Sequence, residues 1–528
     1  MINASFVHTV GMEKNKMKIA QIFGNGMVLQ REKPIPIWGT GTDGEEICIS
    51  FQGQAYQTTV KDGEWFVYMK PSGIARNEEM VILSDLAGLD AGNAVKGTQI
   101  VLTDISVGDV YLAGGQSNME YWMLYESHYN EEVDLCENAD IRFWDSPKVS
   151  HPLFLEKYDY KESGFWRACD KENLKYYSAL AYYFAKDIQQ TEQIPIGIIG
   201  CNWGGTRAAS WMSHEALSRH GQVWLDEYAL DLKKLGDIDA YIANYIADPL
   251  NDSTDLMRDE FNAAFLPGLS YEEQQEYMKN NPVQPLILGP CHHYRPSGLY
   301  ENMLVKIAPY GLKGVLYYQG ESDEAHGDIY GEVLQDLMQN WRDIWKDKEL
   351  PFFIVQLAPY GKWLWYGGEN YPVLRESQER AVKSDGRAYL VSSSDVGAKY
   401  DIHPKSKKEL GYRAALLARK YLYGENLTGD APKLTEARVD EEKLVLTFEN
   451  AKQLQLEGEY LAAAKARGEV ETGLQNCKAV VDGNRVILTG ENWDMYDEVI
   501  LAYEAYYCVN LYNEEAVPAV PSKIMIKK

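Results

Sequence analysis

The stretch VYLAGGQSNME, from Val110 to Glu120, joins an apolar run to two glycines and a Gln-Ser-Asn triplet. The apolar run predicts a buried strand, and the triplet predicts the start of a helix. Serine accepts hydrogen bonds from free backbone N–H groups at a helix start, so Ser117 can be a helix cap. The glycines also suit a sharp turn, where a helix N-terminus would stabilise an anion near the serine. Ser117 is therefore either a cap or a nucleophile.

Strand-like and helical runs alternate between about residues 109 and 425. The strand-like runs are VYLAG, IPIGIIG, GVLYYQG, PFFIVQLAP and AYLVSSSDVG. Apolar residues recur at helical spacing in 178–188, 331–345 and 408–422. This alternation is typical of parallel βαβ units, so an α/β fold is expected, with a sheet covered by helices on both faces.

Short strand-like runs without helical spacing lie on both sides of this region. Residues from about 17 to 108 predict a small β-sandwich or jelly roll, and a β pattern returns from about 430. A chain of 528 residues is too long for one core. We expect domains at 1–108, 109–426 and 427–528, with a polar, helix-rich insertion at about 213–300 that borders the site.

The charge and the cysteine content of the chain exclude several kinds of binding partner. The formal net charge is -26, and there is no block of Lys and Arg, so nucleic acids and anionic membrane surfaces are not expected partners. The seven cysteines show no CxxC pair, which argues against a zinc site or a disulfide framework. The sequence shows no secretory signal and no apolar run of membrane-spanning length, so a cytoplasmic location is expected. A homo-oligomer is left open.

Residues that could perform acyl transfer follow several predicted strands. In open α/β sheets, ligands bind at the carboxyl ends of the strands. Those ends are followed by Gly115-Gln116-Ser117-Asn118, by the run 201–207, by Gln319-Gly320-Glu321-Ser322-Asp323 and by the run 399–404. Together they supply a serine, a histidine near an aspartate, a double glycine and a glutamine. These are the parts of a nucleophile, a base and an oxyanion hole.

Each of these residues also has a structural interpretation. Asp401 lies two residues before His403 and can hold the neutral imidazole tautomer, or it can form an Asx-turn. Gly204-Gly205 can expose a backbone N–H to a substrate oxygen or can simply form a loop. The Gln319 amide can donate to an oxyanion or can be a polar residue of the rim.

Two other classes of function stay open. Glu321 and Asp323 could perform general acid and base catalysis on a glycosidic bond. The flanking β modules could instead make the chain a non-catalytic carbohydrate-binding protein. The presence of Ser117, Asp401 and His403 together argues against that second alternative.

Four blocks of the sequence resemble a known family. They are GQSNM (115–119), NWGGTRAASWM (202–212), YQGESD (318–323) and DIHPKSKKELGYR (401–413), and weaker likeness extends over nearly the whole chain. In this order the blocks resemble the sialate O-acetylesterases and related carbohydrate acetylesterases of the SGNH hydrolase superfamily. Many SGNH enzymes have an asparagine in the third block and place the aspartate three residues before the histidine. This chain has Gln319 in that block, and its Asp401 is two residues before His403.

The resemblance implies a three-layer α/β/α core and a serine esterase site that needs neither a metal nor a cofactor. It implies Ser117 as nucleophile and His403 as base, with Asp401 as the orienting carboxylate and Glu321 as the alternative. The oxyanion hole would combine the N–H groups of Ser117 and Gly205 with the Gln319 amide.

The expected substrate is an O-acetylated carbohydrate. O-acetyl sialic acid is favoured, and acetylxylan or another plant polysaccharide is the alternative. The residues expected to contact it are Gln116, Arg207 and Glu321. The positive charge of Arg207 would suit the sialic acid carboxylate, although a surface position or an intramolecular ion pair explains this arginine equally well.

Overall fold

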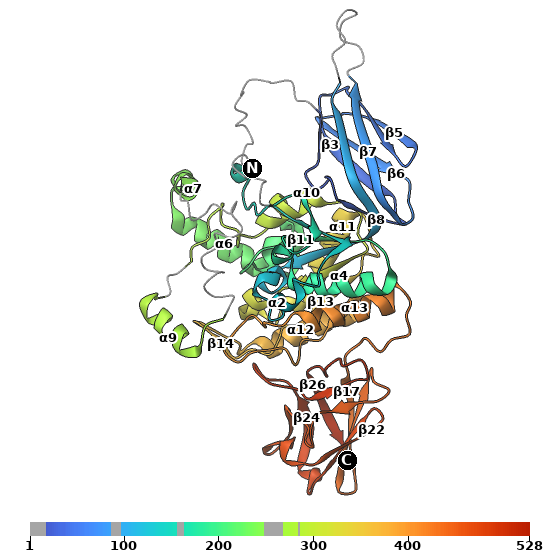
Figure 1. Ribbon diagram of the computed structural model, residues 1–528. Coiled ribbons are helices and arrows are strands. Elements are labelled where there is room, and N and C mark those ends of the chain that lie inside the picture. The colour runs from blue at the N-terminus through green and yellow to red at the C-terminus, as the bar shows by residue number, and fades with distance from the viewer. Residues whose placement is uncertain (1–16, 86–96, 156–162, 248–267, 283–285) are drawn as a thin grey trace, which may run out of the picture.

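A computed structural model describes residues 17–85, 97–155, 163–247, 268–282 and 286–528 (Figure 1). Its elements confirm the predicted mixture of strands and helices. The largest sheet has the strand order β10-β9-β11-β8-β12-β13-β16. From β9 to β16 all neighbours are parallel, and β10 is antiparallel to β9. The strands are β8 (Gln99–Gly115), β9 (Asn138–Asp145), β10 (Trp166–Cys169), β11 (Ile196–Asn202), β12 (Gly314–Tyr318), β13 (Phe352–Val355) and β16 (Ala388–Val391).

Helices pack on both faces of this sheet. Tyr111 of β8 contacts Phe184 of α4 (Ala179–Glu192) with 4.7 Å between ring centroids. Three residues on, a side chain at Gly114 would meet Trp341 of α11 (Tyr330–Trp345). Because successive residues of a strand point to opposite faces, α4 and α11 cover opposite sides of β8. A strand buried on both faces explains why Val110–Ala113 is continuously apolar.

The three predicted helical stripes are confirmed. They correspond to α4, α11 and α13 (Lys408–Leu422). Ser178 caps α4 by accepting a hydrogen bond from the N–H of Ala181. The α13 helix packs against α4, and α12 (Tyr371–Ser384) packs against α11. None of the helices in the described ranges is both long and apolar enough to cross a membrane.

Strand β8 belongs to two parts of the molecule. Its first half pairs with β7 (Ala75–Asp85), and its second half pairs with β11 and β12. The N-terminal strands, blue in Figure 1, are otherwise β1 (Lys18–Ile19), β2 (Val28–Gln30), β3 (Ile35–Thr40), β4 (Glu46–Phe51), β5 (Gln54–Thr59) and β6 (Glu64–Met69). The predicted boundary at residue 108 therefore falls inside a continuous strand.

The C-terminal part contains a separate eight-stranded sheet with its own apolar core, red in Figure 1. The strand order is β21-β20-β24-β26-β17-β18-β23-β22. These strands are β17 (Lys433–Asp440), β18 (Lys443–Glu449), β20 (Ala464–Gly468), β21 (Glu471–Gly473), β22 (Ala479–Asp482), β23 (Arg485–Thr489), β24 (Tyr496–Leu501) and β26 (Ser522–Lys527). The proposed boundary at 426 lies between the end of α13 and the start of β17, and the division into domains stays a prediction.

The described parts of the 213–300 insertion contain helices and no strand, as the sequence predicts. They are α5 (His214–His220), α6 (Gln222–Leu235), α7 (Ile238–Ala247) and α9 (Tyr271–Asn280). The rest of this prediction, at 248–267 and 283–285, lies outside the described residues.

Short elements complete the fold. They are α1 (Ser117–Glu120), α2 (Tyr129–Glu132), α3 (Pro152–Leu155), α10 (Val305–Ile307) and the paired strands β14 (Lys362–Trp363) with β15 (Tyr366–Gly367) and β19 (Gln455–Leu456) with β25 (Leu511–Tyr512).

A buried arginine joins the C-terminal part to the rest of the chain. Arg375 of α12 donates to the carbonyl oxygens of Leu357 and Ala358 at 2.7 and 3.0 Å. It also donates to those of Glu504 and Ala505 at 2.7 and 2.9 Å. One guanidinium group therefore holds two distant segments together.

We predict that Arg375→Met lowers the free energy of unfolding by about 3 kcal/mol or more, because four carbonyl oxygens lose a charged donor. Urea unfolding of the full chain measures this change. The control is Arg380→Met, on the same helix but half-exposed, which should change stability by no more than about 0.5 kcal/mol. Equal effects of the two substitutions would contradict the role given to Arg375.

Candidate active site

Three strand ends bring the predicted site residues together. In the parallel register, Gly115 of β8 is opposite Asn202 of β11 on one side and Tyr318 of β12 on the other. The residues that follow these strands are therefore neighbours at the carboxyl edge of the sheet, where open α/β sheets bind ligands.

Ser117 is the first residue of α1, directly after the turn that ends β8. Gly115 has φ +138°, and a side chain there would approach the Tyr318 carbonyl oxygen to 2.1 Å. Only glycine fits this close approach of two strands. The glycines of the opening stretch thus allow the chain to turn, and the turn leaves Ser117 half-buried at the sheet edge.

His403 faces the serine. Its Nε2 atom lies 3.0 Å from the Ser117 Oγ atom, although 286 residues separate the two in sequence. The imidazole is buried, and the ring of Trp363 meets it edge-on with 5.3 Å between centroids. The distance is that of a nucleophile and its general base.

Asp401 lies on the other side of the imidazole. Its Oδ1 atom accepts a hydrogen bond from the backbone N–H of His403 at 2.8 Å and lies 3.6 Å from the His403 Nδ1 atom. Its Oδ2 atom pairs with the Lys405 ammonium at 2.8 Å. Within the described residues, Nδ1 has no hydrogen-bond partner. Asp401 thus forms the turn considered from the sequence and also directs a carboxylate toward the imidazole.

The surroundings favour a neutral imidazole beside an ionised carboxylate. Burial lowers the pKa of His403, and the charges of Lys407 and Lys405 lower it further, while Asp401 opposes the shift. For Asp401, burial acts to raise the pKa, but the nearby His403 side chain and the charge of Lys405 lower it overall. A histidine that is neutral at neutral pH can accept a proton.

Glu321 reaches the histidine only indirectly. It lies in a 3-10 helix, η6 (Glu321–His326), and its Oε1 atom accepts a hydrogen bond from the Asn118 amide at 2.6 Å. The same amide donates to the carbonyl oxygen of Ile402, the residue before His403, at 3.0 Å. Burial raises the pKa of Glu321 to about 7.

Lys407 completes this buried linkage. Its ammonium donates to the Asn118 Oδ1 atom and to the Pro404 carbonyl oxygen, both at 2.7 Å. Burial lowers the pKa of Lys407 to about 7. No role for Asn118 or Lys407 was evident from the sequence, although Asn118 lies in the block 115–119 and Lys407 in the block 401–413 that carry the family resemblance.

The double glycine lies against the serine. A side chain at Gly204 would contact the Ser117 Cβ atom at 3.4 Å, and the Gly204 N–H donates to the Glu120 Oε2 atom at 2.6 Å. Gly205 has φ +72°, and a side chain there would overlap the Tyr294 hydroxyl at 2.0 Å. In the described part of the chain, no hydrogen bond occupies the N–H of Ser117 or of Gly205. Both are available to a substrate oxygen.

The side-chain amide of Gln319 was predicted to donate to the oxyanion, but it faces acceptors inside the protein. Its amide nitrogen lies 2.6 Å from the Asp323 Oδ2 atom and 3.1 Å from both the Gln116 Oε1 atom and the Thr206 carbonyl oxygen. The amide is fully buried, and these acceptors use its hydrogens. The carbonyl oxygen of Thr206, the residue after Gly205, is thereby fixed. Sequence order alone could not show which way this amide points.

Gln116 and Arg207 are also engaged within the protein. Gln116 is buried and donates to the Ser322 Oγ atom at 3.2 Å, so it joins two loops instead of facing outward to substrate. Arg207 is half-buried and pairs with Glu227 of α6 at 2.8 Å. This is the intramolecular ion pair that the sequence left open for Arg207.

The two carboxylates of the glycosidase alternative are held in the interior. Asp323 is fully buried and accepts hydrogen bonds from the Ala208 N–H at 2.8 Å and from Gln319. Glu321 is 9% exposed and bound to Asn118. Neither carboxylate is arranged as an exposed acid or base beside a glycosidic bond.

A second buried ion pair borders the serine. Glu120, three residues after Ser117 on α1, pairs with Lys148, which follows β9. The Lys148 ammonium lies 6.0 Å from the ring centres of both Trp122 and Trp203. No motif in the sequence around Lys148 marks it as part of the site.

Comparisons with known proteins find relatives among the carbohydrate esterases. Residues 289–422 match a family model described as "Carbohydrate esterase, sialic acid-specific acetylesterase". The sialate O-acetylesterase of Mus musculus is 26% identical over 83% of this chain and 80% of its own length. That of Homo sapiens is 25% identical over 83% of this chain and 78% of its own length.

A solved structure extends the likeness to the fold. A carbohydrate acetylesterase from Xanthomonas citri superposes with a TM-score of 0.72 at 25% identity, covering 96% of this chain and 99% of that one. The chain is therefore a carboxylic ester hydrolase that is similar to the sialate O-acetylesterases and to related carbohydrate acetylesterases.

Proposed function

We propose that the chain is a serine esterase that removes O-acetyl groups from carbohydrates, with O-acetyl sialic acid as its substrate. The observation that carries this proposal is the 3.0 Å contact between the Ser117 Oγ and His403 Nε2 atoms at the carboxyl edge of the parallel sheet. Sialate O-acetylesterase is also the name of the mammalian relatives. Acetylxylan stays the alternative substrate, because its deacetylation needs the same chemistry.

The reaction follows from the positions of these groups. Ser117 attacks the acetyl carbonyl carbon while His403 accepts the hydroxyl proton. The tetrahedral intermediate collapses, the bond to the sugar oxygen breaks, and His403 returns the proton to the sugar alcohol. Water then attacks the acetyl-enzyme with His403 again as the base. Acetate leaves, and Ser117 regains its proton.

The N–H groups of Ser117 and Gly205 would stabilise the oxyanion. A preorganised donor of this kind contributes about 3–4 kcal/mol to the transition state. In this proposal, Gln319 supports the loop by holding the Thr206 carbonyl oxygen. Asp401 orients His403, which is supported by its two contacts with that residue.

We further propose that residues 109–426 form the three-layer core of an SGNH hydrolase between two β-rich domains. The parallel strand order and the helices on opposite faces of β8 support this assignment. The cytoplasmic location and the oligomeric state stay predictions.

Ser117→Ala should abolish hydrolysis of p-nitrophenyl acetate while circular dichroism stays unchanged, because the nucleophile is lost without a change in the turn. Ser218→Ala, at an exposed position on α5, is the control. A serine-directed sulfonyl fluoride should label the native chain once, at Ser117, as mass spectrometry would show.

The same preparation is then tested on O-acetyl sialic acid and on acetylated xylan, with the higher kcat/KM expected for the first. Retained activity in Ser117→Ala would refute the serine mechanism. A higher kcat/KM for acetylated xylan would identify xylan as the substrate in place of O-acetyl sialic acid. The proposed serine mechanism would be unaffected.

Asp401→Asn should lower kcat by roughly 10²–10⁴-fold, because the imidazolium loses its counter-charge. The pKa of His403 is already below 6.5 and should fall further, since Asp401 raises it. The base works in its neutral form, above its pKa, so the acid limb of the kcat/KM profile lies below pH 6.5 and moves lower in the variant.

Glu321→Gln is the matched comparison and keeps an acceptor for Asn118, so its kcat should fall by less than about 10-fold. A larger loss in Glu321→Gln than in Asp401→Asn would assign the orienting role to Glu321.

Gly205→Ala should lower kcat for p-nitrophenyl acetate by about 10²–10³-fold, the effect of losing one oxyanion donor. The added methyl group would overlap Tyr294 and disfavours the positive φ angle, so the N–H must move. Gly204→Ala is the neighbouring control, because its methyl group meets only ordinary contacts at 3.4 Å. Similar kinetics for both variants would argue against an oxyanion role for Gly205.

A further inference from the structure

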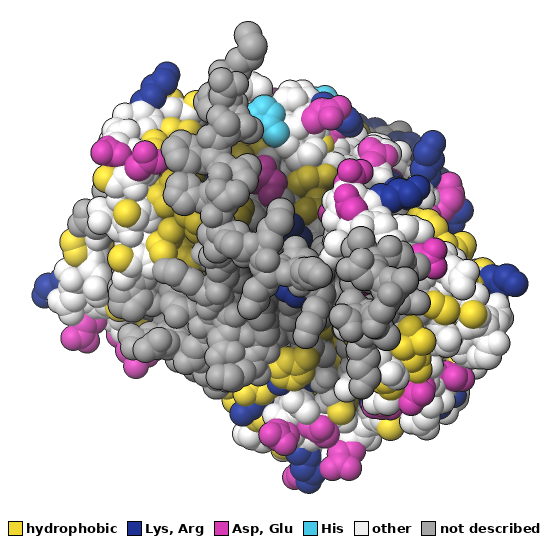
Figure 2. Space-filling model, turned by 90° about the horizontal axis from the view of Figure 1, so that it is seen from above, with side chains coloured by type: hydrophobic (Ala, Val, Ile, Leu, Met, Phe, Trp, Pro, Cys, Tyr) yellow, Lys and Arg dark blue, Asp and Glu magenta, His cyan; other side chains and the backbone are white. Residues whose placement is uncertain are grey.

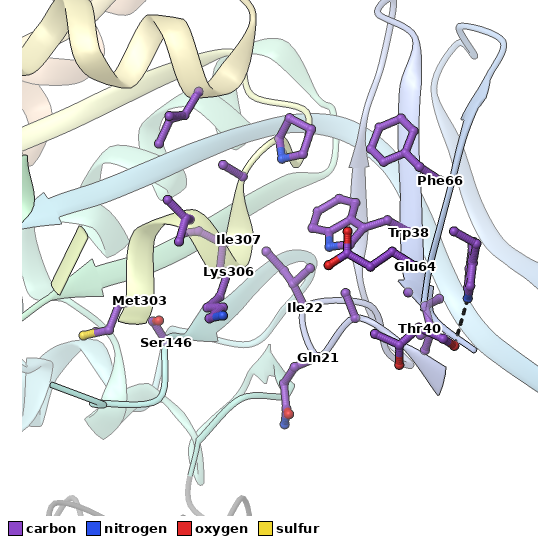
Figure 3. A pocket seen from close by; sticks show the side chains of 18 of the residues that line it. Gln21, Ile22, Trp38, Thr40, Glu64, Phe66, Ser146, Met303, Lys306 and Ile307 are labelled. Atoms are coloured by element: carbon purple, nitrogen blue, oxygen red, sulfur yellow. Dashed lines mark hydrogen bonds between the residues drawn. The ribbon is translucent and has the colours of Figure 1, made fainter. Parts of the chain in front are cut away.

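A large cleft lies between the N-terminal strands and the α/β part of the chain (Figure 3). Its volume is about 920 Å³, which is at the upper end of the range for small-ligand sites. One wall comes from β3 and β6, and the opposite wall from η5 (Tyr300–Leu304), a π-helical turn, and from α10. The proposed mechanism uses none of its lining residues.

The wall from β3 and β6 carries an aromatic surface. The rings of Trp38 and Phe66 are within 17° of parallel, with 6.3 Å between their centroids. Phe66 is 37% exposed, and Figure 3 shows both rings at the cleft. An apolar ring face exposed in a cleft is suited to pack on the C–H face of a pyranose, while polar groups beside it bind hydroxyl groups. Gln21, Thr40 and Ser146 supply such groups.

The charges in the cleft are opposite in sign to those of the whole chain. The charged residues among its lining are three lysines, Lys61, Lys306 and Lys346, and one glutamate, Glu64. Within the described ranges, no ion pair engages Lys306 or Lys346. In a chain of net charge -26, a local excess of cations favours an anionic ligand.

On the face drawn in Figure 2, the coloured side chains around the grey residues show no comparable separation of charge. In Figure 2, acidic and basic side chains are interspersed on the visible face, with hydrophobic side chains among them.

One short segment connects the cleft with the catalytic edge. Ser146, Pro147 and Val149 line the cleft, whereas Lys148 between them pairs with Glu120, three residues after Ser117. Ser146 and Lys148 are separated by at most about 7 Å of backbone. The cleft and the serine thus lie on two sides of the same four residues.

We propose that this cleft is a second carbohydrate site, which binds a carboxylated sugar unit of an oligosaccharide. The sugar ring packs on Phe66 and Trp38, and its carboxylate faces Lys306 and Lys346. The inference rests on the proposed function for its ligand class, because it extends the substrate from a single acetylated sugar to a larger acidic saccharide.

The test measures binding of 3′-sialyllactose, tri-galacturonate and neutral maltotriose to the full-length Ser117→Ala chain by isothermal titration calorimetry. Both acidic ligands should bind, maltotriose should bind more weakly, and added salt should reduce the difference. Lys306→Met should weaken acidic-ligand binding by about 3-fold and Phe66→Ala by about 5-fold. A preference between the two acidic ligands identifies the sugar as a sialic acid or a uronic acid.

Matched controls are Lys443→Met and Tyr460→Ala, two exposed positions in the C-terminal part, which should leave binding unchanged. In the chain with Ser117 intact, Lys306→Met and Phe66→Ala should hydrolyse p-nitrophenyl acetate at the native rate. Equal binding of maltotriose, no effect of the cleft variants, or no binding of any saccharide would overturn the proposal. A native chain that binds but hydrolyses no acetate would instead refute the proposed esterase function.

Discussion

The contact between Ser117 and His403 depends on a buried polar linkage beside it. Asn118 belongs to the helix of the serine, and Lys407 follows the histidine, yet their side chains meet at 2.7 Å in the interior. Asn118 also holds the backbone of Ile402. Two segments that are nearly 290 residues apart are thereby fixed beside Ser117 and His403. An amide provides this link well, because it donates to one partner and accepts from another.

The buried linkage contains one basic and one acidic side chain, Lys407 and Glu321, with Asn118 between them. Burial lowers the pKa of Lys407 and raises that of Glu321, each to about 7, so neither group holds its charge as firmly as in water. A buried charge is tolerated only when hydrogen bonds replace its hydration. Asn118, between the two, offers its oxygen to the ammonium and its nitrogen to the carboxylate. Lys407 also lowers the pKa of His403 and so favours the neutral imidazole that the proposed mechanism needs.

The sequence predicted the elements of the fold better than the directions of its polar side chains. Apolar periodicity located α4, α11 and α13, because a helix that covers a sheet must repeat its buried face. Ligands bind at the carboxyl ends of the strands in open α/β sheets, and this rule predicts that Ser117 and the run 201–207 lie close together. Gln319 lies in one of the quoted blocks, but its amide turns inward to Asp323 and Thr206. The direction of this amide depends partly on Thr206, which is 113 residues away, and no local pattern encodes that partner.

The N-terminal strands and the C-terminal sheet are attached to the α/β part in different ways, and their buried apolar cores show the difference. The N-terminal strands share one continuous apolar core with the α/β part, which includes Ile37 and Ile49 together with Leu112 and Ile198. The C-terminal sheet buries a separate core of its own. Because β8 runs from the N-terminal strands to Gly115, its hydrogen bonds pass directly from one sheet to the turn that presents the serine. The N-terminal strands therefore stabilise the same body that carries the site, whereas the C-terminal sheet is attached through contacts such as those of Arg375. A composition shift near residue 108 marks a change in secondary structure but cannot reveal that one strand serves both sheets.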